Sequence, residues 1–301
     1  MWDSMWKSLS LCRGIGITLS LFSVVCLTDP GHAEDGRAED GVIRVMSFNL
    51  RYGTANDGEN HWNRRDAFVA DVIRSFNPDL LGTQETMGLQ ADYLRAQLTG
   101  MAYIGTSRDQ NANGEQCGVL YRRDRFDERE SGQFWLSETP EVQFSQSWDS
   151  SLPRIATWVR LLDRTTKREF LFLNTHFDHR GEVARLRAAE LIRRFVEQRA
   201  ATMPVIVIGD FNCAEGAPPY KALLSSKRLA DSFRIIHREH QADEGTFNGF
   251  LGTTDGARID WILCSPEWKV MAAGIDRSAR AGRYPSDHFP VHAVLQLGLA
   301  P

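Results

Sequence analysis

Polar residues with chemically useful side chains stand at the ends of several short apolar runs. One apolar run from Val45 leads into Asn49, and another from Leu80 leads into Glu85. Similar residues mark the ends of four further apolar segments: His176, Asp210 with Asn212, Asp260, and Asp287 with His288. If these ends share one edge of the predicted sheets, their side chains form a single polar cluster.

The residue types of this cluster suit one kind of chemistry. Carboxylates and carboxamides without clustered thiolates form a hard, oxygen-rich ligand set, which favours Mg²⁺ or Mn²⁺ over a structural zinc ion. Two histidines with an aspartate partner add proton transfer or charge stabilisation. A hard dication with Asn and His donors is what hydrolysis of a phosphate ester requires, because charge on the phosphoryl oxygens must be stabilised while a carboxylate orients the attacking water.

Each of these residues also has an ordinary structural interpretation. A lone Asn such as Asn49 at a strand end is most often a turn residue or cap, and a lone Glu such as Glu85 is usually a solvated surface group. Gly209-Asp210-Phe211-Asn212 is a stronger signal, because glycine permits close backbone approach and two polar side chains follow on the same side of an extended chain. The functional interpretation depends on the joint occurrence of all six segments in order.

The elements that must position these residues are short strands with helices between some of them. Eight apolar, β-branched runs are predicted to be strands: 43–50, 80–83, 118–121, 157–162, 170–175, 205–208, 259–263 and 291–297. An apolar stripe over 69–76 predicts a helix behind a possible cap at Asn63 and ended by Asn77-Pro78, and a second stripe predicts a helix over 188–196. Helices interspersed among many strands indicate a layered α/β or α+β domain.

Length and composition exclude several classes of protein. With 301 residues, 42% hydrophobic and 25% charged, the chain can bury a full-sized core, so disorder, collagen and a disulfide-stapled miniprotein are excluded. The formal net charge of -4 lacks the basic excess of a non-specific nucleic-acid binder. No linker-like stretch divides the chain after its first 40 residues, although the length alone allows one large domain or two small ones.

The first 33 residues are predicted to be an export signal. Lys7 and Arg13 supply positive charge, residues 15–27 are apolar, and Gly31-His32-Ala33 offers small residues for cleavage. An uncleaved anchor or a buried helix is the alternative for so short an apolar run. We therefore expect a mature domain over 34–301 that is exported to the periplasm or secreted. It is expected to be a monomer without a transmembrane anchor.

The three cysteines of the mature domain, an odd number, allow no complete disulfide framework and are expected to be buried and inert.

At this point the residues resemble the endonuclease/exonuclease/phosphatase superfamily of DNase I-like hydrolases. The resemblance spans Ser47-Phe48-Asn49-Leu50 to Ser286-Asp287-His288-Phe289-Pro290, with each main motif in order. The segments 49–52, 135–140 and 174–179 are similar to a bacterial exported group related to the nocturnin/CCR4-like branch. The resemblance implies a four-layer α/β/β/α sandwich of two mixed β-sheets, with the active site where strand ends of both sheets meet.

The resemblance also implies a metal site for Mg²⁺, with Mn²⁺ as a possible substitute. Glu85 would be the principal ligand, assisted by Asn49 and Asp287.

The catalytic roles implied by the resemblance fall on five residues. Asp210 would orient or deprotonate the attacking water, and Asn212 would hold a phosphoryl oxygen in the transition state. His288 would contact the phosphate with its ring oriented by Asp260, a pairing that favours the charged imidazolium. His176 would help to bind the phosphate or protonate the leaving oxygen.

Four further residues are candidates for contact with the substrate. Arg154 begins a strand and could form a forked contact with a phosphate, although a surface ion pair is equally expected. Trp62 could stack on a substrate ring or could close its loop as a structural residue. Asp178 and His179 follow His176 closely enough to line the same pocket.

These features predict an exported Mg²⁺-dependent phosphoesterase that hydrolyses a phosphate mono- or diester. The acidic balance favours a compact substrate, such as a phosphorylated small molecule or a nucleotide, over polymeric nucleic acid. A secreted metal-dependent endo- or exonuclease is the alternative, because the metal and local arginines can handle a scissile phosphodiester. A hypothesis of another class is a non-catalytic binding module that retains the fold, against which the intact polar series argues.

Overall fold

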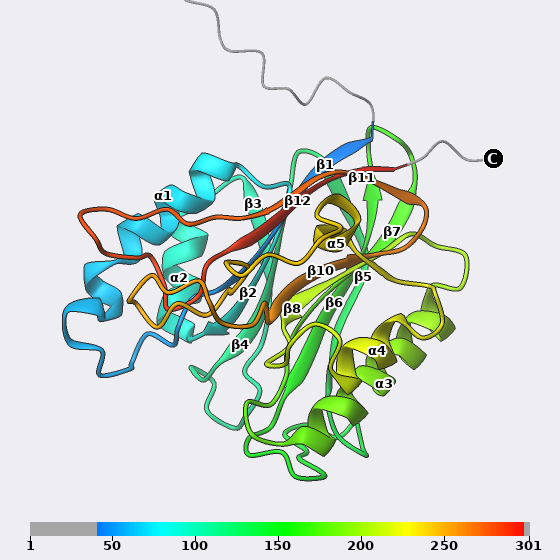
Figure 1. The fold of residues 1–301 in the computed structure, drawn as a ribbon. Helices are drawn as coiled ribbons and strands as arrows, with labels where there is room; N and C mark the ends of the chain where they lie inside the picture. The colour runs from blue at the N-terminus through cyan, green and yellow to red at the C-terminus, as the bar shows by residue number, and fades with distance from the viewer. Residues whose placement is uncertain (1–40, 298–301) are drawn as a thin grey trace, which may run out of the picture. The chain divides into compact units, whose positions relative to one another are not determined.

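Two six-stranded β-sheets lie face to face in the structure, a computed structural model that describes residues 41–297 (Figure 1). The strands of the first sheet are β1 (Val42–Asn49), β2 (Leu80–Thr86), β3 (Met101–Ile104), β4 (Gln116–Arg122), β11 (Trp268–Ile275) and β12 (Val291–Leu297). Those of the second are β5 (Phe126–Trp135), β6 (Ile155–Asp163), β7 (Glu169–His176), β8 (Val205–Asp210), β9 (Ala230–Asp231) and β10 (Asp260–Cys264). The orders are β11-β12-β1-β2-β4-β3 and β5-β6-β7-β8-β10-β9.

Helices cover the outer face of each sheet and complete four layers. The helices are α1 (Asp66–Phe76) and α2 (Gly88–Gln97) on the first sheet, and α3 (Glu182–Arg199) and α4 (Pro218–Leu224) on the second (Figure 1). The short α5 (Ser232–Ile236) packs beside β10 and β11, and two 3₁₀ turns, η1 (Gly58–Asn60) and η2 (Trp62–Arg64), precede α1. The predicted four-layer α/β/β/α sandwich of two mixed sheets is confirmed.

Three apolar clusters hold these layers together. Val45, Val159 and Ile208 belong to the cluster between the two sheets. Ile73 packs with the outer face of the first sheet, and Ile192 packs with that of the second. Burial of such side chains is the main favourable contribution to folding, about 1.5–3 kcal/mol for each large aliphatic residue.

All eight strands predicted from apolar runs are present, and the structure adds β3, β5, β9 and β11. These four are the two edge strands of each sheet. An edge strand carries polar residues on its open side, so it lacks a continuous apolar run. In β5, for instance, the middle residues Glu128 to Ser131 are exposed or half-buried.

The predicted cap at Asn63 is wrong. Asn63 lies inside η2, where its backbone N–H donates to the side chain of His61, and α1 starts after Arg65. The predicted end of this helix is confirmed, because Asn77 takes a left-handed conformation with φ 55° and Pro78 follows.

Two parallel strand pairs set the position of the polar strand ends. β1 pairs in parallel with β2, and β7 with β8, whereas the neighbours β12, β4, β6 and β10 are antiparallel to them. The carboxyl ends of parallel strands meet at one edge, so Asn49 lies near Glu85, and His176 stands opposite Asp210. Because β10 runs antiparallel to β8, its first residue, Asp260, also stands opposite Asp210.

Buried amides join the two sheets just below this edge. Gln84 Nε2 donates to Asn174 Oδ1 at 2.7 Å, and Asn174 Nδ2 donates to the backbone oxygens of Thr83 and Gly118 at 2.9 and 2.8 Å. A Cβ at Gly82 would lie 2.3 Å from Ile208 Cδ1 and 2.8 Å from Asn174 Cγ, so the sheets approach each other closely at this glycine. These contacts fix how the strand ends of one sheet face those of the other.

The described residues all belong to one compact unit. The predicted export signal, residues 1–33, lies outside them. Within 41–297, no helix combines the length and the apolar character that a membrane crossing needs. Cys117 and Cys264 are buried as predicted, whereas Cys213 is half-buried. Burial raises the pKa of all three thiols to about 12, which fits an inert role.

Candidate active site

A cavity of about 740 Å³ opens at the edge where the strand ends of both sheets meet. It is lined by eight residues predicted as site residues: Glu85, Arg154, His176, His179, Asp210, Asn212, Asp287 and His288. Three more, Asn49, Asp178 and Asp260, are buried and contact the lining residues from behind. The topology therefore brings together eleven of the twelve predicted residues.

Asn49 connects two carboxylates of the site. Its Nδ2 donates to Glu85 Oε1 at 3.1 Å and to Asp210 Oδ2 at 3.0 Å, while its Oδ1 accepts the backbone N–H of Arg51 at 2.9 Å. The amide therefore presents donors to the carboxylates, and its oxygen is turned away. This arrangement does not fit the expected role of Asn49 as a metal ligand; Asn49 positions Glu85 and Asp210 instead.

Glu85 reaches the cavity through an irregular backbone. Its φ is 56°, and the pairing of β2 with β4 shifts register between Thr83 and Thr86. A left-handed conformation is costly for a residue with a Cβ, by about 1 kcal/mol or more, and such strain clusters at functional sites. The second carboxylate oxygen of Glu85 accepts the backbone N–H of Tyr52 at 3.0 Å, which fixes the group against β1.

Asp287 is held beside β1 by its neighbour. Ser286 Oγ donates to the backbone oxygen of Asn49 at 2.7 Å. The pKa of Asp287 is raised by burial, which outweighs the lowering effect of His288, and the nearby Glu85 carboxylate raises it further. Arg51 Nε is 3.7 Å from Asp287 Oδ2, yet this guanidinium already forms two hydrogen bonds of 3.0 Å with Asp57.

The charge distribution around the cavity fits a divalent cation. The lining cations have carboxylate partners of their own: Arg51 with Asp57, Arg108 with Glu115, Arg154 with Asp178, and His288 with Asp260. Among residues 41–297, Glu85 has no ion-pair partner, and Asp287 has only the 3.7 Å contact with Arg51. Two oxygen-donating carboxylates in a shared cavity suit Mg²⁺ or Mn²⁺, which would balance their charge.

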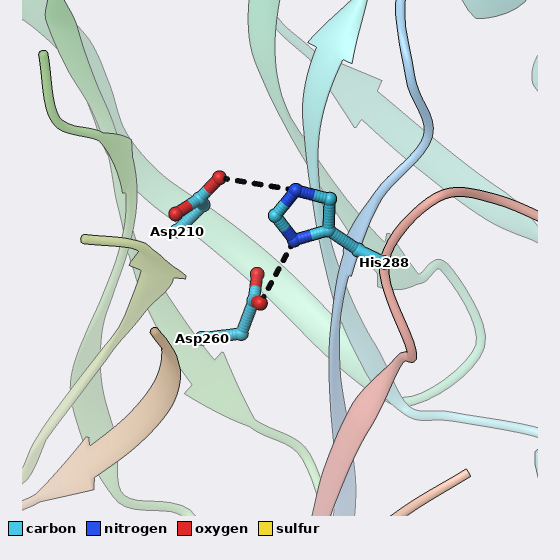
Figure 2. A group of neighbouring side chains, drawn as sticks. All are labelled: Asp210, Asp260 and His288. Atoms are coloured by element: carbon cyan, nitrogen blue, oxygen red, sulfur yellow. Dashed lines mark hydrogen bonds and ion pairs between the residues drawn. The ribbon is translucent and has the colours of Figure 1, made fainter. Parts of the chain in front are cut away.

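His288 joins two aspartates of the second sheet, as Figure 2 shows. Its Nδ1 lies 2.9 Å from Asp260 Oδ2, and its Nε2 lies 3.7 Å from Asp210 Oδ2. Burial alone would lower the pKa of His288, but Asp260 and Asp210 raise it well above its ordinary value. His288 is therefore an imidazolium, so these three groups, although close enough to surround an ion, form a charged hydrogen-bonded cluster.

Asp210 has a raised pKa, because burial and the charge of Asp260 outweigh the effect of His288. Its Oδ1 accepts the backbone N–H of Asn212 at 2.9 Å. A buried carboxylate whose proton affinity is raised in this way is suited to accept a proton from water near neutral pH.

His176 differs from His288 in its charge. Burial, with the charges of Arg154 and Arg108, lowers its pKa well below the ordinary value, so it is neutral. Its Nε2 lies 3.0 Å from Asn212 Nδ2, which also donates to the Phe177 oxygen at 3.1 Å. Asn212 therefore orients His176, and the predicted contact of Asn212 with a phosphoryl oxygen would require its amide to leave this ring.

Arg154 is buried, with 4% of its surface exposed, so the surface ion pair considered as an alternative is wrong. Its Nε donates to Asp178 Oδ2 at 3.3 Å, and its Nη2 lies 2.8 Å from His179 Nδ1. Asp178 accepts Ser151 Oγ at 2.7 Å and the N–H of Gly181 at 2.8 Å. Asp178 thus supports Arg154 from below and does not border the cavity formed by the described residues.

Trp62, predicted to contact substrate, lies elsewhere. It is 5% exposed, packs in the apolar cluster under α1, and meets Tyr93 edge-on at 5.6 Å between ring centroids. Arg65, which follows η2, donates to the oxygens of Leu50 and Pro285 at 2.7 and 2.8 Å and so ties the loop to the segments after β1 and before β12. Trp62 is a structural residue and is absent from the lining of the described cavity.

The sequence interpretation missed several lining residues. Arg108 and Glu115 lie in the loop between β3 and β4. No apolar run ends at these positions, so the strand-end signal is missing there. Arg51 and Tyr52 also line the cavity, and their place directly after β1 is a signal that could have identified them.

Comparison with known proteins places this site in a family. The model of the endonuclease/exonuclease/phosphatase family matches residues 46–288. A family member from Bacteroides thetaiotaomicron is 35% identical, with a TM-score of 0.80 over 87% of this chain and 100% of that one. A mannosyl-6-phosphatase from the same species is 36% identical, with a TM-score of 0.77 over 84% of this chain and 99% of that one.

More distant relatives are the nocturnins. The Drosophila melanogaster nocturnin is 26% identical over 69% of this chain, and that of Mus musculus is 22% identical over 85%. The chain matches 36% of the length of the fly protein and 65% of the mouse protein. The human nocturnin catalytic domain, solved with bound sulfate, shares the fold at 20% identity, with a TM-score of 0.70 over 86% of this chain and 96% of that one.

Proposed function

Because the chain belongs to the endonuclease/exonuclease/phosphatase family, we propose that it is an exported, Mg²⁺-dependent phosphoesterase acting on a compact phosphate ester. Members of this family hydrolyse phosphate esters, so the chain is a hydrolase of this class. The alternative of a non-catalytic binding module does not fit a site that retains Glu85, Asp210 and His288 around one cavity.

The main observation that supports the proposal is that one cavity is lined by both carboxylates and cationic side chains. Glu85 and Asp287 supply carboxylates, while Arg108, Arg154 and the charged His288, each beside its own carboxylate, supply cations. A divalent cation bound by Glu85 and Asp287 would neutralise charge on the phosphoryl oxygens. The cationic side chains supply the remaining stabilisation of a phosphate anion in a partly closed site.

The pKa shifts of Asp210 and His288 support a role in hydrolysis for each of these two side chains. Asp210 accepts a proton from the attacking water, whose oxygen forms the new bond to phosphorus. The ester P–O bond breaks, and the charged His288 supplies the proton that the leaving oxygen needs. Because Asp210 Oδ2 and His288 Nε2 are 3.7 Å apart, the proton on Asp210 can then return to His288. His176 is neutral and its Nε2 is turned to Asn212, which argues against its expected role as proton donor.

A compact substrate is supported by the size of the cavity. About 740 Å³ is within the range for sites that take small molecules, roughly 300–1,000 Å³. The 36% identical mannosyl-6-phosphatase supports a phosphorylated sugar as the first class to test. Phe247, half exposed and edge-on to His288 at 5.2 Å between ring centroids, offers an apolar surface for the organic part.

Export is supported by residues 1–33, which have the charge and apolar pattern of a signal peptide. Expression of the full gene in a bacterial host, followed by fractionation and N-terminal sequencing, tests this part. Cleavage near Ala33 with the protein outside the cytoplasm is the expected result, and an intact N-terminus in the cytoplasmic fraction would contradict it.

Activity is tested with the purified protein and a panel of substrates. We expect phosphorylated sugars and nucleotides to be hydrolysed with Mg²⁺ or Mn²⁺ and not after chelation. Plasmid DNA in the same buffer tests the nuclease alternative, which would be favoured by nicking faster than turnover of the small esters. Asp210→Asn serves as the control for contaminating phosphatases. Failure to hydrolyse any ester with any divalent metal would refute the proposal.

A further inference from the structure

Two arginines that line the cavity each have a buried side-chain nitrogen without a hydrogen-bond acceptor among the described residues. Arg154 Nη1 and Arg108 Nε are buried and find no hydrogen-bond acceptor among residues 41–297. Their side chains are only 4% and 8% exposed, and both residues line the cavity. A buried donor without an acceptor costs about 1–3 kcal/mol, more for a charged group, so such a pair points to an anionic ligand.

Both guanidinium groups are held in place before any ligand binds. Arg154 is fixed by Asp178 and His179. Arg108 Nη2 donates to Glu115 Oε1 at 2.6 Å, and its backbone oxygen accepts Trp135 Nε1 at 2.8 Å. Each arginine therefore has one balancing carboxylate and donors to spare, which lowers the entropy cost of binding an anion.

The protein is closed behind this pair. Arg108, Arg154, His176 and Glu85 also line a recess of about 10 Å³, bounded at its far side by Cys117 and Ile155. A space of this size holds at most about one water molecule. An organic group therefore has no room on the arginine side, whereas the cavity is open toward Phe247 and Leu152, which are 50% and 37% exposed.

We propose, resting on the function proposed above, that Arg108 and Arg154 together bind a terminal, dianionic phosphate and make the enzyme selective for phosphomonoesters. A monoester presents three non-bridging oxygens, which the arginines and a cation held by Glu85 and Asp287 would share, and its one organic group points toward Phe247. A diester has one charge fewer and a second organic group, which would have to enter the closed recess.

The test compares p-nitrophenyl phosphate with bis(p-nitrophenyl) phosphate in Mg²⁺, using the full-length protein and the variants Arg108→Gln and Arg154→Gln. We expect the wild type to prefer the monoester by more than about 10-fold in kcat/KM. Each variant should lose about 10- to 100-fold on the monoester, the loss expected for a hydrogen bond to a charged group, and less than about 3-fold on the diester. Arg154→Lys, which keeps the charge but loses the fork, should lie between them.

Binding of inorganic phosphate gives a second readout that does not need turnover. Calorimetry in a chelator should show at least a 10-fold weaker affinity in either Gln variant than in the wild type. Arg228→Gln is the matched control, because Arg228 forms an ion pair with Glu267 away from the cavity and its loss should leave phosphate affinity unchanged. Thermal melting of all variants identifies any that fail to fold. If Arg154→Gln fails to fold, Arg154→Lys replaces it in the comparison with the wild type.

Three results would overturn the inference: a wild type that cleaves the diester as well as the monoester, variants that lose both activities equally, or phosphate affinity that does not change. The first two results would not contradict the proposed phosphoesterase function. A protein that cleaves neither ester refutes the proposed function instead, and the calorimetry still decides whether the arginine pair binds phosphate.

Discussion

The two sheets have the same plan but supply different chemistry. In each sheet a parallel pair at the centre, β1 with β2 or β7 with β8, is flanked by antiparallel strands. The first sheet delivers Glu85 from β2, and the segment leading into β12 delivers Asp287. The second sheet delivers neutral His176, Asp210 with its raised pKa, and the buried Arg154.

Strand direction determines where the side chains meet, whereas burial and neighbouring charges determine their protonation states and therefore their chemistry. Burial and neighbouring charge make one histidine neutral and the other charged, although both are imidazoles in the same cavity. His288 links the two halves, because its chain segment leads into β12 of the first sheet and its two partners belong to the second. Under the proposed function, metal binding falls to the first sheet, the proton acceptor Asp210 lies on the second, and the proton donor His288 lies between them.

Removing the base should have the largest effect. Asp210→Asn is expected to lower kcat by about 10²- to 10⁴-fold, because the water loses its proton acceptor. The concentration of Mg²⁺ that gives half-maximal rate should change little, since Asp210 belongs to the second sheet. A large rise in the Mg²⁺ concentration for half-maximal rate, measured by metal titration, would contradict the assignment of metal binding to the first sheet.

Glu85→Gln tests the other half in the same way. A fall of about 10²- to 10³-fold in rate at low Mg²⁺ is expected, with partial recovery as the metal concentration increases. The binding of Mn²⁺, followed by paramagnetic relaxation of water, should weaken in parallel. Unchanged Mn²⁺ binding would place the metal elsewhere.

Asp260→Asn should have an intermediate effect because it acts through His288. Losing the 2.9 Å contact removes the carboxylate that keeps the imidazolium charged and oriented, and a fall of about 10- to 100-fold in kcat is expected with KM nearly constant. Nitrogen-15 NMR of His288 provides a direct check, since its ring should lose the doubly protonated signature. If the His288 ring stays doubly protonated in the variant, Asp260 is not required to keep that imidazole charged.

His176→Gln should be milder, at about 10-fold or less. The ring is neutral and contacts Asn212 at 3.0 Å, so glutamine can replace part of its contact. Steady-state rates on a good and a poor leaving group measure this. A loss of 10³-fold confined to the poor leaving group would show that His176, and not His288, donates the proton.

Trp62→Phe should have the smallest effect on activity, within about 2-fold. The side chain is buried in the cluster under α1, so the cost falls on stability, at about 1 kcal/mol in urea unfolding. A large rise in KM with unchanged stability would return Trp62 to the substrate site.

Most of the site could be predicted because it follows from strand direction. Four buried strands carry a polar residue at or next to their last position: Asn49, Glu85, His176 and Asp210. A buried strand is recognisable in the sequence by its apolar run. Arg108 could not be found in this way, because it follows the edge strand β3, of which only Met101 is buried. The same reason explains why all four missed strands lie at sheet edges.

The error at Trp62 has a different physical origin. Its loop directly follows β1, but the path of a loop depends on long-range hydrogen bonds. The bond from Arg65 to the Pro285 oxygen spans 220 residues, a contact that no local pattern encodes. Whether a donor of Asn49 or its oxygen faces Glu85 depends instead on a local contact, the backbone N–H of Arg51 two residues away, which the residue types alone do not reveal.

The bond from Ser286 to the Asn49 oxygen, which joins residues 237 positions apart, has a consequence for protein synthesis. A nascent chain that has emerged only as far as β10 already contains Glu85, His176, Asp210 and Asp260. It still lacks Asp287 and His288, and β1 has no β12 to pair with. The growing polypeptide therefore stays catalytically incomplete until nearly the whole domain has left the ribosome, and hydrolysis begins only as β12 takes its place between β1 and β11.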